Sequence, residues 1–308
     1  GLVHHPIAVH FIALFVWLAA GLSYSSSALA NLDDWLLDVE LDNSIGFHYG
    51  AGVDGLSIAG LSGALSLPFS YDFFFDYYKT SEDRARYDLN YFSAGINSNP
   101  FETWSVKFEY EYFGKSDVYE QKDYKLSIQY FPSNYLVAIG VSQGDAEAHI
   151  DSLVIDLIEE DLTGGSPLLD RIRNTRLSTD DKGYFAEAKL FLGNWQWGID
   201  GKKVNYSEDI ALLGARDRIQ QLLDQQALAQ IYGLIDCRLS ADGTYAWETS
   251  SLQLGVSRIQ SAVDRQKRDY LFATAEYFPR YWLSFSFTVA DSLEEHLPYA
   301  EFATRIYW

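Results

Sequence analysis

One pattern repeats along most of the chain: about ten residues in which apolar and polar side chains alternate, followed by a break. Alternation with a period of two places one set of side chains on each face of a β-strand. In one such segment Trp104, Val106 and Phe108 share a face, whereas Lys107 and Glu109 share the opposite one. The pattern predicts an all-β protein whose strands each have an apolar face and a polar face.

The breaks between these segments alternate between short and long from Pro68 onward. The short breaks are 67–70, 97–103, 131–134, 193–194, 246–248 and 278–280. The long, charged breaks are 79–86, 115–123, 144–181, 207–230, 261–267 and 292–297. An up-and-down barrel produces this order, because short turns join its strands at one end and longer loops at the other. The break 51–54 does not conform, because it is short where the order requires a long one.

Counting the segments between breaks predicts 14 strands, an even number, as a closed barrel with both chain ends on one side requires. The predicted strands are 38–50, 55–67, 71–79, 86–97, 104–114, 122–131, 135–145, 182–192, 195–206, 231–245, 249–260, 268–277, 282–291 and 298–308. The first is the least regular, because Asn43 could split it. The prediction is a transmembrane antiparallel up-and-down β-barrel.

The apolar faces of such a barrel must meet lipid, where a Lys or Arg at the midplane costs roughly 2–4 kcal/mol, and the polar faces then line the lumen. A soluble two-sheet sandwich reads similarly strand by strand, with its apolar faces packed together. Aromatic residues make up 16% of the chain, which suits a barrel with aromatic girdles at both membrane interfaces. No apolar run in 31–308 is long enough for a transmembrane helix.

The first residues predict a signal peptide. Phe11 to Leu22 is an uninterrupted apolar run of 12 residues, too short to span a bilayer as a helix. Ala28-Leu29-Ala30 supplies a small-x-small cleavage site before Asn31. The usual basic region is missing, since Lys79 is the first basic residue, and the absence of Met suggests a truncated start. We therefore expect a signal segment over 1–30 and a barrel over 31–308.

The final segment, Pro298 to Trp308, alternates an apolar row with a face that carries Glu301 and Arg305, and it ends on an aromatic residue. It resembles the closing strand of Gram-negative outer-membrane β-barrels, although the edge strand of a soluble sheet is the alternative. The resemblance implies an outer-membrane location, contact with outer-membrane lipid and lipopolysaccharide, and recognition by the barrel-assembly machinery, with Trp308 as part of the assembly signal. No motif identifies a specific family.

Barrels of about 14 strands include large-pore monomeric porins and channels that import fatty acids and other hydrophobic substrates. The fatty-acid channels carry an N-terminal hatch of several dozen residues. Here only Asn31 to Leu37 precedes the first predicted strand, so we expect no such hatch. This difference counts against lipid or hydrocarbon import.

Two long breaks differ from ordinary loops. Asp151 to Ser178 and Ser207 to Gln230 contain many apolar residues, and the second shows helical spacing of its apolar positions. These residues predict helical segments in two long extracellular loops. The helices either fold into the lumen or dock a partner protein, or they pack on each other above the rim of the barrel.

Little in the sequence indicates catalysis, metal or nucleic-acid binding. Three histidines follow the signal segment, His48, His149 and His296, and no local motif resembles the outer-membrane phospholipase. No His, Asp or Glu cluster has metal-ligand spacing, and the single Cys237 excludes an intramolecular disulfide. The net charge of −20 argues against nucleic acid, which requires clustered Lys and Arg. We expect no enzyme, no cofactor and no metal.

Charged residues on the predicted inward faces are the candidate functional residues. Nine are acidic and six are basic: Asp72, Asp76, Glu109, Glu111, Glu187, Asp200, Asp236, Glu276 and Glu301; Lys107, Lys125, Lys189, Lys202, Arg238 and Arg305. They either pair across strands and satisfy a polar interior, or form a mildly cation-selective pore, or do both. The leading hypothesis is a passive, porin-like channel. The alternative is a structural or partner-binding barrel whose loops dock another protein or occlude the lumen.

Overall fold

The computed structural model describes residues 43–52, 55–81, 88–98, 103–115, 119–149, 176–207, 234–262, 265–293 and 298–308. They form 14 strands: β1 (Asn43–Gly52), β2 (Ser57–Leu67), β3 (Tyr71–Ser81), β4 (Leu89–Ser98), β5 (Trp104–Lys115), β6 (Tyr119–Tyr130), β7 (Tyr135–His149), β8 (Arg176–Leu192), β9 (Trp195–Tyr206), β10 (Ile235–Ala246), β11 (Ser250–Ser261), β12 (Lys267–Arg280), β13 (Leu283–Ser292) and β14 (Tyr299–Tyr307). Each strand pairs with its chain neighbours, and β14 pairs with β1, so the sheet closes into a barrel. The predicted all-β, 14-stranded antiparallel barrel is confirmed.

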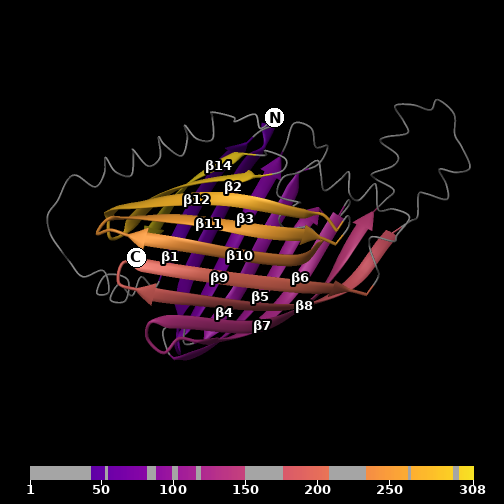
Figure 1. Ribbon diagram of the computed structural model, residues 1–308, viewed down its shortest axis with the longest axis horizontal. Helices are drawn as coiled ribbons and strands as arrows, with labels where there is room; N and C mark the ends of the chain where they lie inside the picture. Colours follow the sequence, from indigo (N-terminus) through magenta and orange to yellow (C-terminus); the bar gives the residue numbers. More distant parts are fainter. Residues whose placement is uncertain are drawn as a thin grey trace, which may run out of the picture.

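Closure depends on the antiparallel pairing of β1 with β14, which runs from Ser44 opposite Tyr307 to Gly52 opposite Tyr299. At one end of this seam the Trp308 backbone amide donates a hydrogen bond to the Asn43 carbonyl oxygen at 3.1 Å. Strands β9 to β12 cross the strands of the rear wall at a large angle in Figure 1, as expected for strands that tilt about a barrel axis. A closed sheet leaves no strand with an unpaired edge.

Short turns connect the strands at one end of the barrel. This is the end at which β1 begins and β14 ends. Gly193, between β8 and β9, has φ +57°, a left-handed conformation that glycine adopts without steric cost. Phe69 and Ser70, between β2 and β3, have φ 68° and 61°, which is uncommon for residues with a Cβ. The predicted short turns are therefore present at this end of the barrel.

Several strands extend beyond their predicted bounds at the other end. The stretch expected to be a loop over 115–123 belongs largely to β5 and β6, and the expected loop 144–181 loses residues to β7 and β8 at both sides. β1 was expected over 38–50 but is described from Asn43 to Gly52. The expected signal segment 1–30, and most of the two expected helical loops, lie outside the described residues.

Candidate functional site

The two faces of the barrel wall have opposite chemistry. On one face, large apolar side chains are open to the surroundings, such as Ile139 (61% exposed) and Leu254 (56%). On the other, polar side chains are covered, such as Ser62 (2%) and Asp123 (4%). A soluble sheet would bury its apolar face. The apolar face here is the one exposed to solvent or lipid.

Contacts between strands that are not neighbours identify the polar face as the inner one. Lys202 of β9 lies 3.5 Å from Asp123 of β6, although β7 and β8 separate these strands in the sheet. Arg305 of β14 donates a hydrogen bond to Ser62 Oγ of β2 at 3.2 Å across β1. In a closed sheet only the concave side brings such side chains together. The charged side chains therefore line the inside of the barrel.

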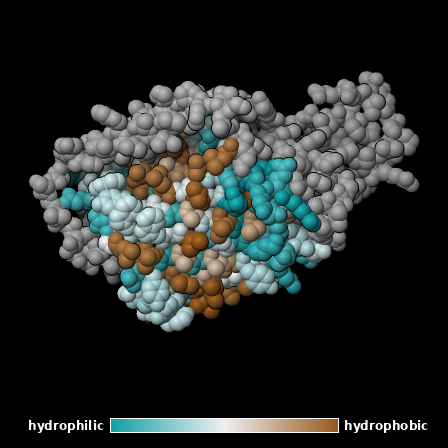
Figure 2. Space-filling model, in the orientation of Figure 1, coloured by the Kyte–Doolittle hydropathy of each residue, from teal (hydrophilic) through white to brown (hydrophobic). Residues whose placement is uncertain are grey.

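Aromatic side chains gather on the outer face near both ends of the strands. At the short-turn end Trp195 stacks on Trp197, with ring centroids 5.4 Å apart, and meets Tyr245 at 4.7 Å. Toward the other end Tyr110 and Tyr124 lie 5.1 Å apart. In Figure 2 apolar and pale side chains cover the middle of the visible wall, and hydrophilic ones gather toward one end. Two aromatic belts around an aliphatic band is the arrangement of a bilayer-spanning barrel.

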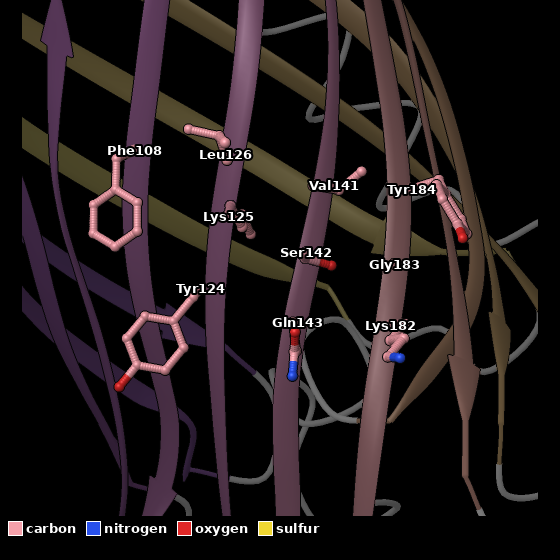
Figure 3. A pocket seen from close by; sticks show the side chains of 10 residues that line it. All are labelled: Phe108, Tyr124, Lys125, Leu126, Val141, Ser142, Gln143, Lys182, Gly183 and Tyr184. Atoms are coloured by element: carbon pink, nitrogen blue, oxygen red, sulfur yellow. The ribbon is translucent and has the colours of Figure 1, made fainter.

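A shallow groove of about 330 Å³ runs along this outer face over β5 to β8. Figure 3 shows Tyr124 and Phe108 at one side of the groove, Tyr184 at the other, and Gln143 with Lys182 near one end. Its position among lipid-facing side chains suits a hydrocarbon chain rather than a polar solute. The groove therefore belongs to the outer surface and not to the lumen.

The strand register places 14 of the 15 predicted charged residues on the inner face. Asp236 is the exception. The pairing of β10 with β11 shifts register between Ile235 and Cys237, and Asp236 makes a 2.5 Å ion pair with Lys203. Lys203 stands opposite Tyr184, which is 61% exposed on the outer face. A bulge thus moves Asp236 away from the face that simple alternation assigned to it. That the other 14 residues line a conducting pore stays a prediction.

The densest group of inner charges lies on β5 and β6. Lys125 Nζ lies 3.6 Å from Glu109 and forms an ion pair with Glu111. Lys107 Nζ lies 2.9 Å from Glu109 and 4.3 Å from the centroid of the Phe74 ring. These side chains are mostly covered, with exposed fractions of 15–31%. Each carboxylate here has a cationic neighbour, so this group is a paired interior rather than a row of free charges.

The other predicted inner charges are more widely spaced. On β8 to β10, Lys189 pairs with Glu187 at 2.6 Å, and Arg238 pairs with Asp200 at 3.3 Å. Asp72 accepts a hydrogen bond from Ser66 Oγ at 2.8 Å. Two further carboxylates meet only hydroxyl-bearing neighbours across the strands: Asp76, opposite Ser62 and Ser93, and Glu276, opposite Ser251 and Ser286. Neither of these two carboxylates makes an ion pair within 4 Å in the described ranges.

The seam carries a relay of polar groups that sequence reasoning did not assemble. His48 Nδ1 lies 2.9 Å from Glu301 Oε1, and His48 Nε2 lies 2.8 Å from Ser62 Oγ. This is the order of groups in a nucleophile, base and acid triad. However, Ser62 is only 2% exposed, and its Oγ also accepts a hydrogen bond from the Arg305 guanidinium. A nucleophile must reach its substrate, so we interpret the relay as a tie between β14, β1 and β2.

Four charged inner residues were missed: Asp123, Asp181, Asp242 and Arg268. Asp123 and Asp181 had been assigned to long loops because charged residues surround them in the sequence. Both lie instead on strand extensions where the outer face is also polar, so alternation of apolar and polar residues disappears. The described inner wall carries 11 carboxylates and seven Lys or Arg side chains once these corrections are made.

Within the described ranges no group of three or more His, Cys, Asp or Glu side chains is placed to hold a metal ion. No helix in these ranges is long and apolar enough to cross a membrane. Cys237 is a free thiol on β10. His296 lies outside the described residues.

No family model matches the sequence, and no curated protein matches it. Several solved structures are similar to this chain at low identity. OccK8 (OprE) of Pseudomonas aeruginosa has a TM-score of 0.42 and 9% identity, covering 82% of this chain and 71% of its own. The KdgM porin has a TM-score of 0.42 and 6% identity, covering 86% and 99%. A bacterial polysaccharide outer membrane secretin has a TM-score of 0.43 and 9% identity, covering 88% and 100%. Similarity of this size does not transfer a substrate, so function is argued from this chain's own residues.

Proposed function

We propose that this protein is a porin-like channel of a Gram-negative outer membrane and passes small hydrophilic solutes by diffusion. The observation that carries the proposal is the chemistry of the barrel wall. Its outer face has aliphatic residues between two aromatic belts, and its inner face is charged. Lipid accepts only closed barrels among β-structures, because every backbone polar group must be paired. A polar inner face is compatible with water or a polar solute in the lumen.

The strand number supports a channel. Eight-stranded barrels have interiors that side chains fill, whereas barrels of 16–18 strands leave an aqueous channel. This barrel has 14 strands, nearer to the second group. We therefore propose a water-filled lumen.

We also propose a weak preference for cations. The described inner wall has more carboxylates than Lys or Arg side chains, and rings of charge set selectivity. Most acids on β5 and β6 are neutralised by lysines, so the preference depends on the sparsely paired ones such as Asp76 and Glu276. An enzymatic role is not proposed, because the Ser62 side chain of the only triad-like relay in the described ranges is buried.

Planar-bilayer recording of the purified, refolded protein tests the proposal. We expect discrete conductance steps and a reversal potential, in a salt gradient, on the cation-selective side. Absence of conductance would remove the channel proposal and leave the alternative of a structural or partner-binding barrel. That alternative depends on the long loops, which lie outside the described residues.

A further inference from the structure

An unusual row of acidic residues crosses the inner wall where β5 to β8 run beyond the apolar band. Glu111 stands opposite Asp123, Asp123 opposite Gly144, and Gly144 opposite Asp181. All four residues therefore lie side by side along one line perpendicular to the strands. Carboxylates placed in one row repel each other unless something compensates them.

The carboxylates of this row differ in how they are compensated. Glu111 is held by Lys125, and Asp123 Oδ2 lies 3.5 Å from Lys202 Nζ. Asp181 makes no ion pair, and neither of its oxygens meets a hydrogen-bond donor among the described residues, although it is only 1% exposed. Burying a charged group without a partner is costly, so an uncompensated Asp181 calls for a further partner.

Gly144 lets the two aspartates converge. A Cβ at Gly144 would collide with Asp123 Oδ1 and would lie 3.0 Å from Asp181 Oδ2, so both carboxylates lean over this glycine from opposite sides. Asp123 Oδ1 and both oxygens of Asp181 have no hydrogen-bond partner among the described residues. Two of these three unpaired oxygens, Asp123 Oδ1 and Asp181 Oδ2, thus converge over a single glycine.

A serine adds a fourth oxygen that does not depend on the acidic row. Ser142, the next inward residue of β7, is 4% exposed, and its Oγ has no partner in the described ranges. A Cβ at Gly183 would collide with Ser142 Oγ, so this oxygen reaches toward β8, where Gly183 is the inward neighbour of Asp181. Figure 3 shows Ser142 between Lys125 and Gly183.

We propose that Asp123, Asp181 and Ser142 bind a hard divalent cation of the Ca²⁺ or Mg²⁺ type on the inner wall. Such cations take oxygen ligands from carboxylates, carbonyls, hydroxyls and water. Two carboxylates balance a charge of +2, and the 3.5 Å ion pair with Lys202 uses Asp123 Oδ2, whereas the unpaired oxygen of Asp123 is Oδ1. With two protein carboxylates the site completes its ligand set with water, so binding is of the weak, extracellular kind, with Kd about 10⁻⁴–10⁻³ M.

Binding is measured directly with Tb³⁺, which replaces Ca²⁺ at oxygen sites and emits when a nearby tyrosine is excited. Tyr206 stands opposite Asp181 in the sheet and supplies that tyrosine. The full chain, refolded in detergent micelles, should show tyrosine-excited Tb³⁺ emission that excess Ca²⁺ displaces. Asp181→Asn should lose this emission, and Ser142→Ala should weaken it. Emission equal to wild type in Asp181→Asn would overturn the proposal.

Thermal unfolding provides a second readout. We expect CaCl2 to raise the unfolding midpoint of wild type by several degrees relative to EDTA, and to leave Asp181→Asn unchanged. Asp242→Asn is the matched control, because Asp242 is also an inner aspartate but is held by Gln253 at 3.0 Å; it should respond to CaCl2 as wild type does. Equal midpoints of wild type in CaCl2 and EDTA would mean that the carboxyl pair holds only a proton or water. Neither readout uses conductance, so this result is independent of the channel proposal.

Discussion

At the residue scale, the inner charges act in two ways that sequence position does not distinguish. Lys125 lies between two carboxylates and is 18% exposed, whereas Lys79 pairs with Asp88 on the outer rim with 53% and 46% of the side chains exposed. Exposed ion pairs contribute little to stability, because water screens them and side-chain entropy opposes them. Covered pairs matter chiefly when one partner is removed, because the other charge then stays buried alone.

Lys125→Gln should therefore lower the free energy of unfolding by about 2–4 kcal/mol, because Glu109 and Glu111 lose their shared cation. Lys79→Gln, the control, should leave the free energy of unfolding nearly unchanged, because this ion pair is exposed to water. Urea unfolding in detergent micelles, followed by tryptophan fluorescence, measures both values. Equal effects of the two substitutions would show that the inner charges are as well solvated as the rim.

At the element scale, glycines opposite aromatic rings shape the inner face of the strands. Gly255 of β11 stands opposite Phe272 of β12, and a Cβ at Gly255 would collide with that ring. Gly60 and Gly95 meet the rings of Tyr78 and Phe74 in the same way. In each case the aromatic side chain of the neighbouring strand occupies the space that a Cβ of the glycine would fill. Contacts between a glycine and an aromatic ring on the next strand help to fix the register of the two strands.

Gly255→Val should destabilise the barrel by about 1–3 kcal/mol, because the Phe272 ring must leave its position. The double variant Gly255→Val/Phe272→Ala should recover part of the loss, since the obstructing ring is gone. Gly201→Ala is the control, because the nearest atoms to its Cβ would be 3.6 and 3.7 Å away. The same unfolding assay applies, and additive losses in the double variant would argue against a direct clash.

At the scale of the whole molecule, one pairing decides whether the sheet is a barrel. β14 pairs with β13 on one side and with β1 on the other. Residues about 250 positions apart in the sequence therefore pair at this seam. His48, Glu301 and Ser62 tie the same three strands together from inside. Such non-local pairing is intrinsically slow to form, because the loop-closure entropy must be overcome first.

Ala303→Pro should prevent closure. Ala303 lies in the middle of β14, opposite His48 and Ser286, and proline both removes a ladder hydrogen bond and disrupts strand pairing. Ala303→Ser keeps the backbone amide and should fold normally. The fraction of heat-modifiable, fast-migrating protein on unboiled gels reports closure. A normal folded fraction in the proline variant would mean that the seam tolerates an open edge.

The second prediction at this scale concerns selectivity. Glu187→Gln/Glu276→Gln removes two inner carboxylates and should shift the reversal potential toward anions, whereas Lys107→Gln/Lys189→Gln should shift it toward cations. The signs are opposite although each pair removes two charges. Planar-bilayer recordings in a salt gradient measure both. Shifts of the same sign would show that these side chains do not face the conducting path.

The sequence by itself determined the class of fold, the number of strands and the polarity of each face, because a period of two is a local property of neighbouring residues. It also predicted 14 of the 15 inner charges correctly by face. It failed where local information ends. Asp236 changed face at a bulge, and Asp123 and Asp181 were missed because both faces of their strands are polar beyond the apolar band.

Only the tertiary structure decided which distant residues meet. The row from Glu111 to Asp181 joins four strands, and the relay of His48 joins residues at opposite ends of the chain. Neither arrangement has a sequence motif, because register between strands is set by cross-strand packing and by turn geometry rather than by spacing along the chain. The candidate cation site therefore depends on the register of β6, β7 and β8, which brings the carboxylates of Asp123 and Asp181 over a single glycine.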